Sequence, residues 1–419
     1  MNKALKKYLQ TRTAQGHWQL SGIERSVFRA AIVIPCLAEA ESLPKTLASL
    51  AANPSGYLQQ TLLIIVVNNR PEASYTQKKN NRATLDWLAE GTLPQLNLNW
   101  VDAASPGLEL PAKEGVGQAR KIGFDLALSR LDWENDPLLI SLDADTLVDE
   151  NYLPAIFRHF SQNSLASATI PFRHQQADDP QQERAIRLYE LYLRSYLFGL
   201  QQSGSPYAYH TIGSAFACRA SAYLAVGGMN RRHAAEDFYF LQQLAKHSGV
   251  AMLTGTVVRP SPRFSERVPF GTGKAVQGQV EEGRQLFQFS SVEAFTILRH
   301  WLSAVENSLL LPAERVLQQL GNDVLIEFLR KLNFAANWEL LQLNYPDLEK
   351  RHLAFHCWFD GLRTRQLLTR LDAEQERMVD DTVRQLLAWG GYPEVFSREA
   401  QLQLLEKLQS ANTNTGAAK

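Results

Sequence analysis

Four short runs of apolar residues recur in the first 145 positions, and each is bounded by turn-forming residues. They span residues 29–38, 61–69, 96–103 and 138–145 and are rich in Val, Ile and Leu, which is typical of strands buried in a parallel sheet. The segments between these runs have apolar residues at the spacing of a helix. Leu43, Leu47 and Leu50 share one face before Pro54, and residues 116–131 form a second amphipathic pattern. This alternation predicts an α/β fold with a doubly wound, mostly parallel sheet.

The pattern loosens after residue 149 and becomes helical from about residue 290. We expect strands within 164–175, 210–229 and 251–263, helices over 183–204 and 236–249, and a flexible loop over 263–279, where arginines, a proline and glycines follow no period. The chain therefore divides into a basic N-terminal extension (1–28), an α/β domain (29–285), an all-helical C-terminal domain (286–410) and a disordered tail (411–419).

Composition narrows the classes of function. The 419 residues carry 43 basic and 43 acidic side chains, so nothing indicates a nucleic-acid partner. The three cysteines, Cys36, Cys218 and Cys357, are far apart, which favours a reducing, cytoplasmic setting. No apolar run approaches the ~20 residues of a membrane span. The helix MNKALKKYLQ could contact an anionic membrane from the periphery, but a solvated basic terminus is the favoured interpretation.

Two carboxylates follow the fourth predicted strand, in the sequence LLISLDADTLVDENYL. Asp143 and Asp145 lie one residue apart, so their side chains point the same way where the strand ends. Two carboxylates placed in this way repel each other unless a cation lies near them. Mg²⁺ and Mn²⁺ prefer oxygen ligands and are commonly bound by carboxylates together with substrate phosphates. The alternative is a solvated acidic turn in which Asp149 caps the next helix.

Five segments in order resemble the family 2 glycosyltransferases of the GT-A fold: IVIPCLAEAESLPKTLASL, LIIVVNN, GVGQARKIGFDLAL, LLISLDADTLVDENYL and GGMNRRHAAEDFYF. The resemblance covers roughly residues 29–260. It implies transfer of a sugar from a nucleoside-diphosphate donor, with UDP or GDP, to a hydroxyl of a glycan, lipid-linked or small-molecule acceptor. It also implies that Asp143 and Asp145 bind Mn²⁺ or Mg²⁺.

The resemblance assigns donor-binding roles to residues that match its motifs: Pro35, Glu39, Asn68, Asn69, Arg120 and Asp143. Two departures are evident. The chain has Cys-Leu-Ala-Glu where the family usually has Tyr-Asn-Glu, and Asn68 and Asn69 where it usually has two aspartates. Independently of the resemblance, Arg263 and Arg267, with Arg259, suit a lid over phosphates, because guanidinium groups bind phosphate bidentately. A histidine could complete the metal shell, the candidates being His174, His210 and His233.

Glu236 and Asp237 match the family's Glu-Asp pair beside the acceptor. The resemblance implies that Asp237 is the general base, which must remain ionised to remove a hydroxyl proton. The alternative is an acidic first helical turn that favours the helix dipole. Inversion of configuration is expected, and retention stays open. Two other functions also stay open, a sugar nucleotidyltransferase and a catalytically degenerate nucleotide-sugar-binding module.

Overall fold

The structure is a computed structural model that describes residues 3–25, 27–91, 93–231, 235–263, 272–281, 285, 287–373 and 378–411. Arg267 and His233 lie outside these residues. The chain forms two compact units. The first consists mainly of Met1–Ile186 and Thr211–Gly283, and the second mainly of Arg187–His210 and Arg284–Gln409. The domain limits expected from the sequence stay a prediction.

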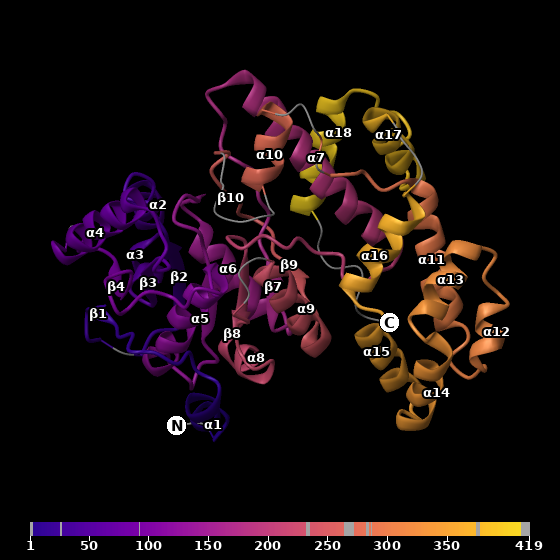
Figure 1. Ribbon diagram of the computed structural model, residues 1–419, viewed down its shortest axis with the longest axis horizontal. Helices are drawn as coiled ribbons and strands as arrows, with labels where there is room; N and C mark the ends of the chain where they lie inside the picture. The colour runs from indigo at the N-terminus through magenta and orange to yellow at the C-terminus, as the bar shows by residue number, and fades with distance from the viewer. Residues whose placement is uncertain are drawn as a thin grey trace. The chain divides into compact units, whose positions relative to one another are not determined.

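The first unit contains an eight-stranded sheet in the order β1-β4-β3-β2-β5-β8-β7-β9 (Figure 1). Its central strands β4, β3, β2 and β5 are parallel, whereas β1 and β8 pair antiparallel with β4 and β5. The strands of this sheet are β1 (Ser21–Gly22), β2 (Ala30–Cys36), β3 (Thr61–Asn68), β4 (Asn97–Ala103), β5 (Leu138–Ser141), β7 (Ser167–Thr169), β8 (Phe216–Arg219) and β9 (Ala251–Met252). A separate pair joins β6 (Leu147–Val148) to β10 (Val258–Arg259).

Burial explains why the central runs form strands. Every residue of β3 is buried, and so is every residue of β2 except Pro35, which is only partly exposed. Helix α5 packs closely on them, because a Cβ at Gly123 would lie only 2.3 Å from Val33 Cγ1. The four parallel strands all end at the same edge of the sheet, where ligands bind in folds of this kind.

Helices complete the first unit. They are α1 (Lys3–Thr11), α2 (Leu43–Ala51), α3 (Ser55–Leu58), α4 (Tyr75–Ala89), α5 (Val116–Ala127), the 3₁₀ turn η1 (Leu128–Arg130), α6 (Tyr152–Gln162), α8 (Ala220–Ala225), α9 (Glu236–Ser248) and α10 (Thr272–Glu281). The flexible loop expected over 263–279 is wrong for its second half, since α10 is helical there and buries Val276 completely. The N-terminal helix is not merely solvated either, because it buries Leu5 and Tyr8.

The second unit is helical. Helix α7 (Pro180–Gln202) runs from the first unit into it, and the others are α11 (Val292–Glu306), α12 (Ala313–Leu317), α13 (Asp323–Lys331), α14 (Phe334–Asn344), α15 (Leu348–Trp358), α16 (Gly361–Leu371), α17 (Val379–Trp389) and α18 (Arg398–Ala411). Its core is aromatic: Trp301 lies edge-on to Phe334, Phe355 and Phe359, with ring centroids 5.3–5.7 Å apart.

The predicted fold class is confirmed: the protein is mixed α/β, with a large, mostly parallel sheet and a C-terminal helical part. Helices α13 and α14 are separated at Asn333, whose φ is 53°. Among the described residues, no helix is both long enough and apolar enough to cross a membrane.

Candidate active site

The turn after β5 holds Asp143 and Asp145 through its backbone. The Thr46 hydroxyl of α2 donates to the Ala144 carbonyl oxygen over 2.9 Å, and the Gln175 side-chain amide donates to the Asp145 carbonyl oxygen over 2.9 Å. Both carboxylates remain partly accessible, with 35% of the Asp143 side chain and 19% of the Asp145 side chain exposed. The turn is therefore held from two sides while its carboxylates face a site that a ligand can reach.

Arg120 joins the two acidic motifs of the sequence. Its guanidinium forms ion pairs with Asp143 and with Glu236, which lie 93 residues apart in the chain. The Arg120 side chain is only 2% exposed. Burial acts against the charged form of Arg120, but the two carboxylates offset that effect and raise its pKa. Arg120 is thus a buried, permanently charged link between the Asp-Ala-Asp turn and the start of α9.

Gly213 makes room for this guanidinium. A Cβ at position 213 would lie 2.3 Å from Nη2 of Arg120, closer than real Cβ contacts come. The Gly213 carbonyl oxygen accepts a 2.6 Å hydrogen bond from the Ser141 hydroxyl, and that hydroxyl accepts one of 3.0 Å from Arg120 Nε. Sequence reasoning missed Ser141 and Gly213, since neither belongs to a charged motif.

Glu236 and Asp237 open helix α9. The preceding Ala235 has a left-handed backbone with φ of 57°, a conformation that is costly for alanine and tends to persist at functional sites. Glu236 is buried against Arg120, whereas Asp237 is partly exposed. Desolvation and the neighbouring Glu236 charge raise the pKa of Asp237 to about 7. Asp237 can therefore change its protonation near neutral pH.

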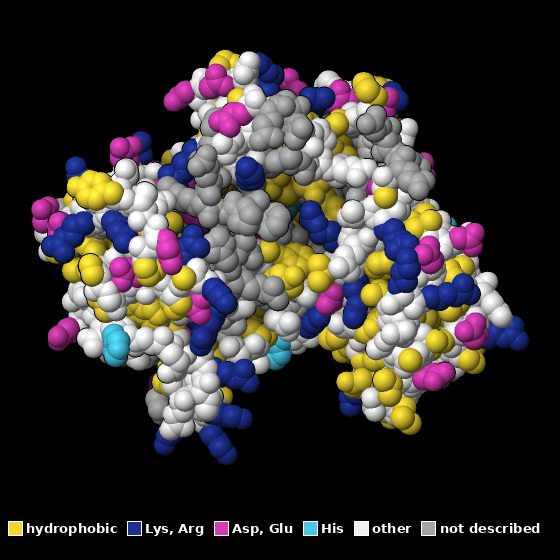
Figure 2. Space-filling model, in the orientation of Figure 1, with side chains coloured by type: hydrophobic (Ala, Val, Ile, Leu, Met, Phe, Trp, Pro, Cys, Tyr) yellow, Lys and Arg dark blue, Asp and Glu magenta, His cyan; other side chains and the backbone are white. Residues whose placement is uncertain are grey.

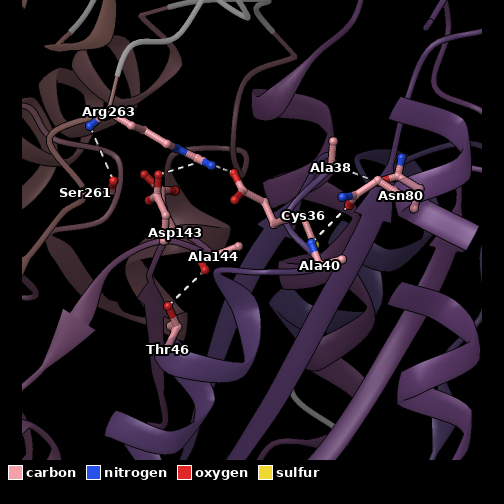
Figure 3. A network of polar contacts seen from close by, with 12 residues as sticks. Cys36, Ala38, Ala40, Thr46, Asn80, Asp143, Ala144, Ser261 and Arg263 are labelled. Atoms are coloured by element: carbon pink, nitrogen blue, oxygen red, sulfur yellow. Dashed lines mark hydrogen bonds and ion pairs between the residues drawn. The ribbon is translucent and has the colours of Figure 1, made fainter. Parts of the chain in front are cut away.

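A second arginine closes the other side of the site. Arg263, which follows β10, forms ion pairs with Glu39 and with Asp145, the latter over 2.7 Å. In Figure 3 its side chain extends from the segment containing Ser261 across the Asp143–Ala144 turn. Burial opposes its charge, but Glu39 and Asp145 hold the pKa of Arg263 above its usual value.

Arg259 is engaged elsewhere. It pairs with Asp149, which also accepts from the Val257 backbone N–H over 3.2 Å. The side-chain cap that the sequence offered for Asp149 is therefore wrong, because the residue at the start of α6 is Asn151 and Asp149 ties that segment to β10.

The polar residues at the ends of β2 and β3 form a buried amide network. Asn68 donates to the carbonyl oxygens of Cys36 and Val66, and Asn69 donates to those of Arg70 and Ala104. These bonds use the Nδ2 groups, which aspartates lack. The two asparagines that depart from the family pattern thus support the loops at the carboxyl ends of the strands.

Two asparagines on α4 belong to this network, and sequence reasoning missed them. Asn81, which is 1% exposed, accepts from the Ala38 backbone N–H over 2.7 Å and donates to Asn69 Oδ1 over 2.8 Å. Asn80 accepts from Ala40 N over 3.0 Å (Figure 3). The available signal was two adjacent amides inside an otherwise ordinary helix. They hold the loop that carries Glu39 and that contains Ala38 at a φ of 54°.

The structure thus brings most candidate residues into two linked groups, Asp143 with Arg120 and Glu236, and Asp145 with Glu39 and Arg263. Pro35 lies in β2 beside Val66. Within the described ranges, no group of three or more acidic, histidine or cysteine side chains has the spacing of a metal site. Asp143 and Asp145 still fit a hard divalent ion, because both are partly exposed oxygen donors at the end of one strand.

Residues 138–285 match the family model described as glycosyl transferase family group 2. This part of the chain is a family 2 glycosyltransferase region. The resemblance inferred from the sequence is confirmed, and the matched residues include both aspartates of the turn and the Glu-Asp pair of α9. No curated protein matches the chain in sequence.

Several solved structures are similar to this chain, and three of them are described below. The complex of TarS from S. aureus (residues 1–349) with UDP-GlcNAc shows 14% identity over 91% of both chains, with a TM-score of 0.39. The mannosyltransferase PcManGT from Pyrobaculum calidifontis, with GDP-Man and Mn²⁺, shows 14% identity over 97% of this chain and 92% of that one, with a TM-score of 0.37. GalNAc-T7 with UDP, GalNAc and Mn²⁺ shows 15% identity over 68% and 52%, with a TM-score of 0.36.

Proposed function

We propose that the protein transfers a sugar from a UDP or GDP donor to an acceptor hydroxyl with inversion, and that Asp237 is the general base. The observation that carries this proposal is the double ion pair of Arg120, which links Asp143 of the Asp-Ala-Asp turn to Glu236 beside the base. Donor-binding and acceptor-activating groups come from distant parts of the chain. One buried cation holds them together, as a displacement reaction requires.

Asp237 is better suited than Glu236 to act as the general base. The Glu236 carboxylate is buried and paired with Arg120, so taking up a proton there would break an ion pair. The pKa of Asp237 is raised to about 7 by desolvation and by Glu236, close to the operating pH that favours general-base catalysis. In the proposed step, Asp237 removes the proton of the acceptor hydroxyl while the hydroxyl oxygen bonds to the anomeric carbon. The nucleoside diphosphate leaves with the electrons of the broken bond.

The leaving diphosphate needs positive charge. A divalent Mn²⁺ or Mg²⁺ at Asp143 and Asp145 would neutralise that charge. Arg263, which pairs with Asp145 and Glu39 in this structure, is placed to turn its guanidinium to phosphate oxygens when a donor binds, because phosphate accepts the same bidentate contacts as carboxylate. Pro35, Asn68, Asn69 and Arg267 remain proposed donor-binding residues. For the two asparagines we propose an indirect role through the loops they support.

The test is a thermal-shift panel of UDP, GDP and their sugar conjugates, with and without Mn²⁺. Wild type is compared with Asp145→Ala and with a matched control, Asp86→Ala, whose carboxylate is 57% exposed on α4. We expect metal-dependent stabilisation by one nucleotide that Asp145→Ala abolishes and Asp86→Ala keeps, since a ligand at one hundred times its Kd stabilises by about 2.7 kcal/mol. No response to any nucleotide would refute the donor-site proposal and favour a degenerate module.

A further inference from the structure

The N-terminal helix carries a concentrated positive charge on a chain that is neutral overall. Residues 1–23 contain Lys3, Lys6, Lys7 and Arg12, and the first acidic residue is Glu24. Lys3, Lys6 and Lys7 lie on one side of α1 and are exposed, whereas Leu5 and Tyr8 on the other side are buried. Figure 2 shows dark blue side chains projecting where Figure 1 places the N-terminus and α1. We call Lys3, Lys6, Lys7 and Arg12 the basic face.

The structure holds α1 firmly on the first unit. The Tyr8 hydroxyl donates to Asp125 Oδ1 over 2.8 Å and accepts from Lys121 Nζ over 2.8 Å. The Ala14 backbone N–H donates to Asp125 Oδ2 over 2.7 Å, and Tyr223 donates to the same carboxylate over 2.8 Å. Burial disfavours the charged forms of Lys121 and Tyr8, so it lowers the pKa of Lys121 and raises the pKa of Tyr8.

The double glycine of GGMN, Gly227 and Gly228, also contributes to the surface on which α1 packs. Gly228 has a φ of 82°, and a Cβ there would lie 1.9 Å from the Tyr8 hydroxyl oxygen. A Cβ at Gly227 would lie 3.9 Å from Arg12 Nη1. The basic face therefore adjoins the loop that leads, within nine residues, to Glu236 at the start of α9. The loop also carries the exposed Arg231, which lies 3.8 Å from Glu114.

From this arrangement we infer that the basic face docks the protein on an anionic membrane surface. Clusters of four or more basic side chains bind anionic lipid headgroups, and each side chain near the surface strengthens binding about fivefold. The helix is already folded and anchored, so docking costs no ordering of α1. The exposed side of α1 has no large apolar residue, so binding is electrostatic and does not involve insertion. Given the proposed function, docking brings the Gly227–Gly228 turn, which precedes Asp237 in the chain, toward the leaflet, and this suits a lipid-linked acceptor.

The test is co-sedimentation of the full chain with two kinds of vesicle, phosphatidylcholine alone and phosphatidylcholine mixed with phosphatidylglycerol. We expect binding only to the anionic vesicles and its loss in high salt, because a screened surface potential no longer attracts the lysines. The variant K3Q/K6Q/K7Q should bind on the order of 100-fold more weakly, at about fivefold for each lysine. The charge-retaining K3R/K6R/K7R should bind like wild type.

The matched control is K45Q/K79Q/K350Q, which removes the same charge from exposed lysines scattered over the chain, and it should bind like wild type. Docking is overturned if K3Q/K6Q/K7Q binds as well as this control, if wild type ignores anionic vesicles while binding soluble polyphosphate, or if phosphatidylcholine alone suffices. The glutamine variant should keep the nucleotide response in the thermal-shift panel. Failure of the proposed donor site would remove that response and leave vesicle binding intact, so the two failures are distinguishable.

Discussion

Replacing Arg120 with glutamine tests whether one buried cation holds the site together. The substitution leaves Glu236, whose side chain is 6% exposed, without its ion-pair partner. Breaking a buried pair from one side costs about 3–5 kcal/mol, because the remaining charge is buried and uncompensated. Asp143 adds little, since 35% of its side chain is exposed and a pair that water screens contributes about 0–1 kcal/mol. We therefore expect Arg120→Gln to destabilise the first unit by about 4 kcal/mol.

The assay is thermal unfolding followed by near-ultraviolet circular dichroism. A domain of this size loses about 2–4 °C in Tm for each kcal/mol, so we expect a fall of roughly 8–16 °C. The matched control is Arg82→Gln, which removes an arginine that pairs with Asp86 on the surface of α4, where the two side chains are 69% and 57% exposed. It should change Tm by no more than about 3 °C.

The pH dependence makes the test specific to charge. Removal of Arg120 takes away a charge that lowers the pKa of Glu236, which burial already raises. A carboxyl group whose pKa is raised in the folded state contributes stability that is present at acidic pH and lost as pH rises through the folded pKa. The Tm deficit of Arg120→Gln should thus shrink toward about pH 5 and grow toward about pH 8. A deficit equal to that of Arg82→Gln, or one independent of pH, would refute the reasoning.

Four further outcomes follow from the same geometry. Asp237→Asn should lower the rate of sugar transfer by about 10²–10⁴-fold while nucleotide binding persists, which initial rates and thermal shifts check together. In wild type, kcat/KM should rise with pH through about 7 as Asp237 loses its proton; a flat pH profile would argue against this base. Gly213→Ala should lower Tm because its Cβ would meet the buried guanidinium at 2.3 Å, whereas Gly56→Ala, with nothing within 4 Å, should not. Asn81→Leu should cost about 1–3 kcal/mol by removing the amide that bonds to the Ala38 N–H and to Asn69 Oδ1, which urea unfolding measures. Asn97→Leu removes an amide at the opposite end of the strands and is the control, and thermal shifts with nucleotide check whether donor binding falls only in Asn81→Leu.

Much of the first unit could be predicted because local pattern and tertiary structure agree there. The apolar runs of β2 and β3 are buried on both faces, which leaves a continuous apolar signal in the sequence. The charged site residues could also be predicted from the sequence, since Asp143, Asp145, Glu236 and Asp237 stand in recognisable motifs. Composition and motif spacing report which residue types are present at the carboxyl ends of strands.

The rest of the site depends on contacts that no local pattern carries. Asn81 is an unremarkable amide in an amphipathic helix, and only tertiary packing brings it to Ala38, 43 residues away. Gly213 is needed for the space it leaves to a guanidinium from another helix. Helically spaced aromatic residues are ambiguous in the same way, because their spacing does not say whether they face a core or a ligand. Tyr192 is buried, and Tyr192 and Tyr196 both pack in the aromatic core of the second unit.

The charge inventory of the site ties these observations together. Among the described residues, the two linked groups contain two guanidinium groups, Arg120 and Arg263, and with Asp237 five carboxyl groups: Glu39, Asp143, Asp145, Glu236 and Asp237. If every group were ionised, the excess would be three negative charges in a partly desolvated space, which is unfavourable. A proton on Asp237 reduces the excess by one, so desolvation and repulsion from Glu236 both raise the pKa of that group. The remaining excess lies beside Asp143 and Asp145, where a divalent cation would offset it. The surplus negative charge thus adds to desolvation in raising the pKa of the proposed base toward neutrality, and it also favours cation binding at the donor side.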